Sequence, residues 1–235
     1  MITKKELKQI NSLAHKKGRK SQQQFVVEGK KSVEEFIAAG FQPKNLFYTE
    51  DPSLEGAIAV TESEMQKMSF LKNASPYLGV FEIPAPNPLP QKGRILVLDK
   101  VADPGNLGTI LRICDWFGIT HVVGSLDTVD CYNPKVVQAS MGSLARVQCQ
   151  YADLNQFLST TQCAVYGTYL EGESIYNTTF PEDVILVMGS EANGISKALS
   201  ALIEQKVTIP KKSLNGPESL NVAIATALVL GEISR

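Results

Sequence analysis

Three polar stretches in the C-terminal half of the chain combine residue types that could carry out group transfer. The first follows the apolar run Ile95–Leu98 and contains Asp103, Asn106, Gly108 and Arg112. Asp103 can cap the N-terminus of a helix, with a proline at its first position. An arginine early in a helix gains nothing from the helix dipole, which points to a ligand or a partner. From this stretch alone, an arginine in solvent is the simpler alternative.

The second stretch is a glycine turn that carries a carboxylate. It follows the apolar run Val184–Met188 and reads Gly189-Ser190-Glu191-Ala-Asn-Gly194. Glycines allow a ligand to approach the backbone closely, and Glu191 could orient a hydroxyl or accept a proton. The alternative is that Glu191 only caps the helix that follows.

The third stretch begins at Ile209-Pro210 and ends at Ser219-Leu220-Asn221, directly before the apolar segment VAIATALVLGEI. A helix that is apolar on all faces must be buried on all faces. Near the end of a chain, this predicts packing between the protein's own sheet and a partner subunit. A central core helix is the alternative.

Alternating strands and helices are expected to position these stretches. Apolar strands separated by helices indicate a parallel sheet that is covered on both faces, with ligands bound beyond the carboxyl ends of the strands. Trp116 and Cys114 are expected to pack. The expected strands are Arg94–Leu98, His121–Val123, Arg146–Gln150, Ala164–Thr168, Val184–Met188 and Lys206–Ile209, and the expected helices are Gly105–Phe117, Pro134–Met141, Leu154–Ser159, Ser196–Ile203 and Leu220–Ile233.

A proline-rich segment divides the chain. Pro84, Pro86, Pro88 and Pro90 alternate, which favours an extended spacer and excludes a helix. We therefore expect a first domain over residues 1–86, a linker over 87–93 and a second domain over 94–235. The first domain is predicted to be a small α/β unit with helices at Leu7–His15, Lys31–Ala39 and Thr61–Met68, the last opened by a capping box from Thr61 to Glu64, and strands at Gln24–Glu28, Lys44–Thr49 and Tyr77–Ile83.

Composition excludes several classes of protein. The four cysteines form no CxxC pair and the chain has two histidines, so neither a disulfide scaffold nor a metal site is expected. No apolar stretch is long enough to span a membrane, and the N-terminus lacks the apolar region of a secretory signal. We expect a reduced, cytoplasmic protein without membrane contact. A nicotinamide-binding enzyme is excluded because no GxGxxG motif follows a strand.

Charge is distributed unevenly. Residues 1–31 contain nine lysines and arginines against two glutamates, a net +7, whereas the rest of the chain carries a net −8. A basic end on an acidic body indicates contact with a polyanion, or else a solubilising tail.

Together, the three stretches resemble the SpoU family of RNA ribose methyltransferases, of the SPOUT class. Its Asn-x-Gly-x-x-x-Arg motif matches Asn106, Gly108 and Arg112, and its Gly-x-Glu-x-x-Gly motif matches Gly189, Glu191 and Gly194. The third motif matches Ile209-Pro210 and Ser219-Leu220-Asn221. The N-terminal stretch, Arg19 with Phe25–Lys30, is similar to the family's accessory RNA-binding domain. The Lys211–Glu218 loop departs from the pattern because it is longer and more basic.

The resemblance implies a C-terminal α/β domain with a parallel sheet and a deep trefoil knot, together with a ribosomal-protein-like N-terminal domain. It implies a homodimer that transfers a methyl group from S-adenosylmethionine to a ribose 2′-hydroxyl of structured RNA, with ribosomal RNA favoured over transfer RNA. The alternative is a catalytically silent RNA-binding or ribosome assembly factor on the same fold. The intact motif residues argue against it, because a silent relative has no chemical need for them.

The resemblance also assigns roles to residues. The family's favoured proton acceptor corresponds to Arg112, but guanidinium stays protonated in proteins. We instead expect Arg112 to hold a phosphate and stabilise the developing alkoxide, Asn106 to hold Arg112, and Glu191 or water to accept the proton. Ser219 and Asn221 would orient the hydroxyl. The donor-binding residues are expected to be Thr168, Gly189, Ser190, Gly194, Ile209, Pro210, Leu220 and Asn221, and the RNA-binding residues Lys16, Lys17, Arg19, Lys20 and Lys30.

Overall fold

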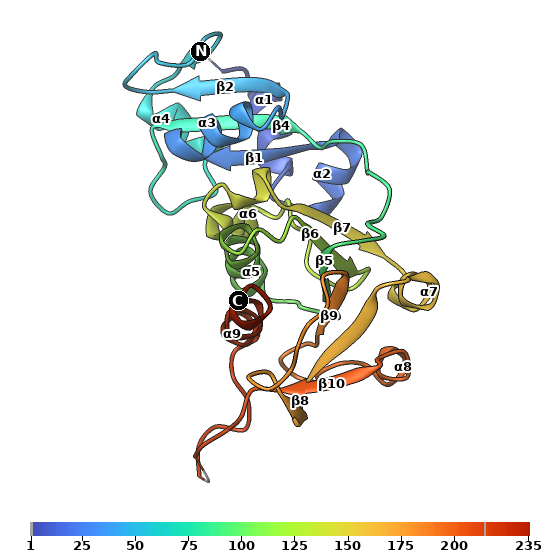
Figure 1. Cartoon of the computed structure of the whole chain (residues 1–235). Coiled ribbons are helices and arrows are strands. Elements are labelled where there is room, and N and C mark those ends of the chain that lie inside the picture. Colours follow the sequence, from blue (N-terminus) through green and yellow to red (C-terminus); the bar gives the residue numbers. More distant parts are fainter. Residues whose placement is uncertain (1, 214) are drawn as a thin grey trace. The chain divides into compact units, whose positions relative to one another are not determined.

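The computed structural model describes residues 2–213 and 215–235, which form two compact units (Figure 1). The N-terminal unit comprises Met1–Ala85 and Asp130–Arg146, and the C-terminal unit comprises Pro86–Val129 and Val147–Arg235. The segment 130–146 was expected within the C-terminal domain. By its contacts it belongs to the N-terminal unit, because its helix packs on a strand there. The assignment of RNA binding to the first domain and methyl transfer to the second stays a prediction.

The C-terminal unit is built on a six-stranded sheet in which every strand pair is parallel. The strand order is β10-β8-β9-β5-β6-β7. The strands are β5 (Arg94–Leu98), β6 (His121–Ser125), β7 (Gln148–Ala152), β8 (Ala164–Ser174), β9 (Val184–Met188) and β10 (Gln205–Thr208). The predicted parallel sheet is thus confirmed, and the predicted bounds of β5 and β9 match. The predicted knot stays a prediction.

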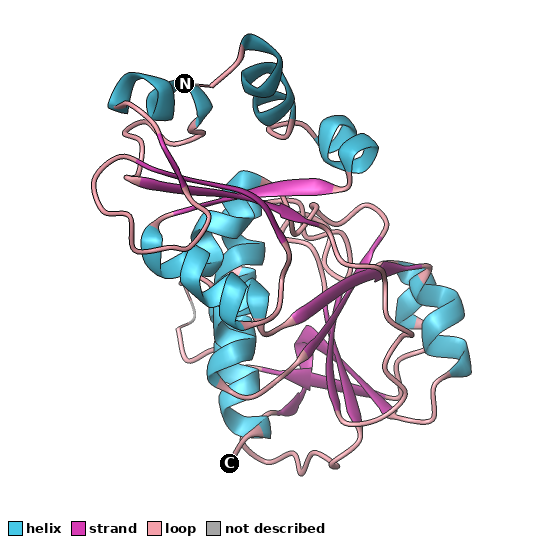
Figure 2. Ribbon diagram, turned by 90° about the horizontal axis from the view of Figure 1, so that it is seen from above, coloured by secondary structure: helices cyan, strands magenta, loops and turns pink. Residues whose placement is uncertain are grey.

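Helices lie on both sides of this sheet (Figures 1 and 2). They are α5 (Pro104–Trp116), α7 (Leu154–Thr160), α8 (Lys197–Ser200) and α9 (Val222–Ile233). Ile95 and Val97 of β5 pack in one core cluster with Phe157 of α7 and Leu199 of α8. Because side chains alternate along a strand, Leu96 and Leu98 face the other side, where α5 and α9 pack against each other.

Helix α5 shows why one expectation about packing is wrong. Its buried face consists of Leu107, Gly108, Ile110, Leu111 and Cys114, as expected for Cys114. Trp116 was also expected to pack, but its side chain is 85% exposed. The helical period places Trp116 on the opposite side from the buried face.

The N-terminal unit contains a smaller four-stranded sheet in the order β1-β4-β2-β3. Its strands are β1 (Gln24–Glu28), β2 (Pro43–Tyr48), β3 (Ile58–Ala59) and β4 (Tyr77–Glu82). Its helices are α1 (Lys4–Ser12), α2 (Lys16–Gln22), α3 (Lys30–Ala38), α4 (Glu62–Met68) and α6 (Pro134–Ser140), with a 3₁₀ turn, η1, at Ser143–Ala145. The expected capping box is present, since Thr61 and Glu64 exchange side-chain and backbone hydrogen bonds at the start of α4. Helix α2 and strand β3 were not predicted.

Two absences hold for the residues that the structure describes. Within residues 2–213 and 215–235, no helix is both long and apolar enough to cross a membrane. The same residues contain no cluster of histidine, cysteine and carboxylate side chains that could hold a metal ion.

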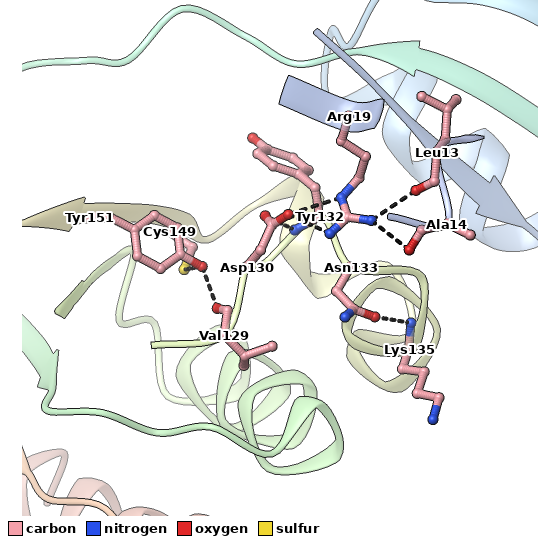
Figure 3. Close-up of polar contacts among 10 residues, drawn as sticks. All are labelled: Leu13, Ala14, Arg19, Val129, Asp130, Tyr132, Asn133, Lys135, Cys149 and Tyr151. Atoms are coloured by element: carbon pink, nitrogen blue, oxygen red, sulfur yellow. Dashed lines mark hydrogen bonds and ion pairs between the residues drawn. The ribbon is translucent and has the colours of Figure 1, made fainter. Parts of the chain in front are cut away.

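A buried ion pair between Arg19 and Asp130 holds segment 130–146 within the N-terminal unit (Figure 3). The Arg19 guanidinium donates to Asp130 Oδ2 from Nε at 2.9 Å and from Nη2 at 2.6 Å. Its Nη1 donates to the carbonyl oxygens of Leu13 and Ala14. Next to the pair, the Tyr132 ring lies 4.6 Å from the Phe25 ring. Arg19 is therefore a structural residue that joins α2 to a segment 111 positions away.

Replacing Arg19 by alanine should destabilise the N-terminal unit. The change leaves the Asp130 carboxylate without its cation, and breaking a buried pair in this way costs about 3 kcal/mol. Urea denaturation followed by circular dichroism measures the free energy of unfolding. Lys17→Ala, an exposed position on the same helix, is the control and should change it by less than about 0.5 kcal/mol. Equal effects of the two substitutions would contradict the structural role of Arg19.

Candidate active site

The three polar stretches begin at the carboxyl ends of parallel strands. Strand β5 ends at Leu98 and its neighbour β9 ends at Met188, while β10 ends at Thr208. Because the strands are parallel, these ends lie at the same edge of the sheet. This is the edge where open α/β sheets bind ligands.

A chain of side-chain hydrogen bonds connects the stretches. Asn221 Nδ2 donates to Asn106 Oδ1 at 2.9 Å, and Asn106 Nδ2 donates to Glu191 Oε1 at 2.5 Å. One residue of each predicted motif takes part. We call Asn221, Asn106 and Glu191 the amide relay.

Helix capping explains how the two asparagines meet. Asp103 caps α5 and accepts the Asn106 N–H at 2.8 Å, as predicted. Asn221 caps α9, and its Oδ1 accepts the N–H groups of Ala223 and Ile224. The relay therefore lies where the N-termini of α5 and α9 come together, which is a favourable place for an anion.

The glycine turn after β9 is closed on itself. Ser190 and Gly194 exchange two backbone hydrogen bonds at 3.1 and 2.9 Å, and Ser190 Oγ accepts the Asn193 N–H. A Cβ at Gly189 would lie 2.1 Å from the Gly194 carbonyl carbon, so only glycine fits there. The predicted reason for the glycine was the approach of a ligand. In the structure, the approach of the loop's own backbone is the constraint.

Asp99 is a site residue that the sequence analysis missed. It directly follows β5, is 2% exposed, and accepts the Ser196 N–H through Oδ2 at 2.7 Å. Its own N–H donates to the Met188 carbonyl at 2.9 Å. Asp99 thus anchors the far end of the loop that carries Glu191. A carboxylate placed directly after a buried strand was the available signal.

The other residues predicted to bind the donor are not connected to one another by side-chain hydrogen bonds among the described residues. Thr168 Oγ1 donates to the Val187 carbonyl at 3.3 Å. Ile209 and Pro210 follow β10 and are half-buried, whereas Ser219 and Leu220 are exposed just before α9.

The basic loop between Pro210 and Ser219 is described except for one residue. Leu214 lies outside the described residues. Lys211 and Lys212 are exposed, and Lys211 Nζ donates to the Gly216 carbonyl at 3.3 Å.

Arg112 does not contact Asn106, contrary to expectation. Asn106 uses its amide group for Glu191 and Asn221, and six residues of helix turn Arg112 about 120° away from it. Arg112 is exposed and has no hydrogen bond or ion pair with any residue within 2–213 and 215–235. Its guanidinium is free to bind a group from outside this chain.

The residues predicted to bind RNA differ in availability. Lys16, Lys17 and Lys20 are exposed on α2, but Arg19 is buried in its ion pair and cannot reach a phosphate. Lys30 is half-exposed and pairs with Asp51 at 2.8 Å. The neighbouring Glu28 accepts hydrogen bonds from Ser69 Oγ and the Phe70 N–H, and burial raises the pKa of its carboxyl.

Two substitutions of Asp99 should show whether its hydrogen bond with the Ser196 N–H supports binding of the methyl donor. Asp99→Leu removes the acceptor for Ser196 and should weaken binding of S-adenosylmethionine about tenfold, the effect of roughly 1.4 kcal/mol. Asp99→Asn keeps an acceptor oxygen and should stay within about threefold of the original. Isothermal titration calorimetry on the full chain measures both, with thermal denaturation to confirm folding. Equal weakening in both variants would show that the hydrogen bond to Ser196 is not the cause.

Comparisons with known proteins show the family to which the chain belongs. The model of the SpoU rRNA Methylase family matches residues 93–231, and that of the MRM3-like substrate binding domain matches residues 4–79. The 23S rRNA (guanosine(2553)-2′-O)-methyltransferase RlmP of Bacillus subtilis is 28% identical, and the alignment covers 96% of this chain and 94% of RlmP.

Two solved structures share the fold over nearly the whole chain. One, from Porphyromonas gingivalis and assigned to the TrmH family of RNA methyltransferases, has a TM-score of 0.91 at 39% identity and covers 99% of this chain and 98% of that one. The AdoMet-bound rRNA methyltransferase from Sinorhizobium meliloti has a TM-score of 0.88 at 28% identity and covers 99% and 95%. The chain belongs to the SpoU family and is an S-adenosylmethionine-dependent RNA ribose 2′-O-methyltransferase.

Proposed function

We propose that this methyltransferase acts on ribosomal RNA in the cytoplasm and works as a homodimer whose subunits share each active site. The amide relay is the observation that supports placing the reaction at this site, because it connects one residue of each motif at one edge of the sheet. The ribosomal substrate is supported by the relatives from Bacillus subtilis and Sinorhizobium meliloti, both named as rRNA methyltransferases.

The loops after β9 and β10 suit the methyl donor. The turn from Gly189 to Gly194 is closed by two backbone hydrogen bonds between Ser190 and Gly194, so its shape is fixed before a ligand binds. Residues proposed to hold the donor are Thr168, Gly189, Ser190, Gly194, Ile209, Pro210, Leu220 and Asn221. When bound, S-adenosylmethionine supplies a sulfonium methyl group that an oxygen nucleophile can attack.

The proposed roles of the acidic and basic residues follow from their contacts. Asn106 fixes one oxygen of the exposed Glu191 carboxylate, which leaves the other to accept the 2′-hydroxyl proton directly or through water. Arg112 keeps its charge, holds the adjacent phosphate and stabilises the developing alkoxide. Ser219 and Asn221 position the hydroxyl for attack in line with the departing sulfur.

An exposed apolar stripe supports the dimer. Leu220, two residues before α9, and Ile224 and Leu228 within it are 47%, 52% and 40% exposed and recur every fourth residue. Ile224 and Leu228 therefore lie on one face of the helix. This is the face that the apolar sequence predicts to be covered by a partner subunit. In an isologous dimer, the unoccupied guanidinium of Arg112 would complete the partner's site.

Sharing of the site predicts complementation between two inactive variants. Arg112→Ala and Asn221→Ala should each nearly abolish methyl transfer while leaving the dimer intact. Co-refolded mixtures should recover roughly a quarter of the original activity, since about half of the dimers are mixed and each has one complete site. Incorporation of labelled methyl groups into RNA measures the recovery. If native mass spectrometry detects mixed dimers but no activity returns, both residues act within one subunit.

RNA affinity should depend on the exposed lysines of α2. Replacing Lys16, Lys17 and Lys20 by alanine removes up to three phosphate contacts and should flatten the dependence of log K on log salt by roughly two to three units. Fluorescence anisotropy with ribosomal RNA fragments measures the slope. The triple alanine variant of Lys44, Lys67 and Lys72, which are exposed in the same unit, is the matched control and should leave the slope within about one unit. An equal change in both variants would mean that net charge alone, and not α2, sets the affinity.

A further inference from the structure

We propose that Trp116 is a stacking platform for a base of the RNA strand that carries the target ribose. Trp116 is the only tryptophan in the chain, and its side chain is 85% exposed at the last residue of α5. The inference rests on the proposed role of Arg112 in holding RNA beside the ribose.

The position of Trp116 relative to Arg112 fits a nucleotide. Thr109, Arg112 and Trp116 are exposed on α5 at spacings of three and four residues, so they lie on one face of the helix. Side chains four residues apart have their Cβ atoms about 6 Å from each other. A cation at the phosphate and an aromatic ring at a base one turn away is a common arrangement in the binding of single-stranded RNA.

The core of the protein does not need this tryptophan. Helix α5 buries Leu107, Ile110, Leu111 and Cys114 on its opposite side. An exposed indole stabilises the folded chain little, and a solvent-facing helix position is served better by alanine. A large aromatic side chain left in solvent beside Arg112 is therefore better explained by a ligand than by packing.

The surroundings of Trp116 favour RNA over a second copy of the chain. Helices α5 and α9 run side by side, with Asn106 bonded to Asn221 at one end and Phe117 close to Gly231 at the other. Trp116 therefore lies level with the C-terminal end of α9. The exposed apolar stripe on α9 stops at Leu228, and beyond Gly231 the helix carries Glu232, which pairs with Arg235. The end of α9 level with Trp116 therefore carries a charged pair in place of the apolar stripe, and charged groups are depleted in the core of a subunit interface.

The single tryptophan allows a direct test in the full-length protein. The probe is 23S ribosomal RNA from cells that lack this gene, and its binding is followed independently by sedimentation. We expect saturating RNA to quench the tryptophan emission by about half or more, since stacking on a base quenches indole. We also expect Trp116→Ala to raise the KM for RNA roughly tenfold, while the KM for S-adenosylmethionine stays unchanged. Trp116→Phe, which keeps an aromatic face, should restore most of the affinity, and Thr109→Ala on the same face is the control.

Two results would overturn the assignment. The first is emission that stays constant while the RNA binds. The second is emission that shifts with protein concentration in the absence of RNA, together with dissociation of the Trp116→Ala dimer, because this would place Trp116 in the subunit contact. If ribosomal RNA is not the substrate, the wild-type enzyme would bind this RNA without methylating it. The quenching of the tryptophan emission would still decide the role of Trp116.

Discussion

The two hydrogen bonds made by the side chain of Asn106 are the interactions on which the candidate active site depends. They connect α5 with Glu191, 85 residues away, and with Asn221, 115 residues away. A primary amide suits this position because it donates and accepts at once, whereas a carboxylate could not donate to Glu191. Each partner is in turn held by its own segment, Asn221 by capping α9 and Glu191 by its position in the closed glycine turn. The three motifs therefore form a single polar unit.

The backbone around this unit is constrained by contacts within the protein. Gly189 must be glycine because Gly194 and Ile195 occupy the space of a side chain, and Asp99 ties the end of the same loop to β5. A loop held at both ends keeps Glu191 in place without burying it, which leaves the carboxylate accessible to a substrate. Precise positioning of an exposed group generally requires such support from buried neighbours. In this protein the support comes partly from the motif glycines and partly from Asp99, which the motif comparison does not include.

The basic residues of the N-terminal segment have two different roles, since some are exposed to solvent and one is buried in an ion pair. Lys16, Lys17 and Lys20 remain in solvent on α2, whereas Arg19 on the same helix is 2% exposed and pairs with Asp130. The pair belongs to the packing of segment 130–146 in the N-terminal unit, where Tyr132 also contacts Phe25. A fragment that begins at the proline-rich linker would keep this segment but lose the surface that covers it. The N-terminal unit is thus built from two separate parts of the chain, although the sequence suggests a single division at the linker.

Local sequence determined much of this structure. The predicted bounds of Gln24–Glu28, Arg94–Leu98 and Val184–Met188 match, as do the caps at Asp103 and Thr61, because apolar runs and capping residues act through neighbours in the chain. The motif spacing also located Asn106, Glu191 and Asn221. Only the tertiary structure decided which of two adjacent basic residues is buried, Arg19 rather than Lys20. It likewise decided that Asn106 contacts Glu191 instead of Arg112, and that Asp99 anchors a loop 97 residues away. These outcomes depend on contacts between distant segments, whose free energies are set by shape and burial and leave no periodic signal in the sequence.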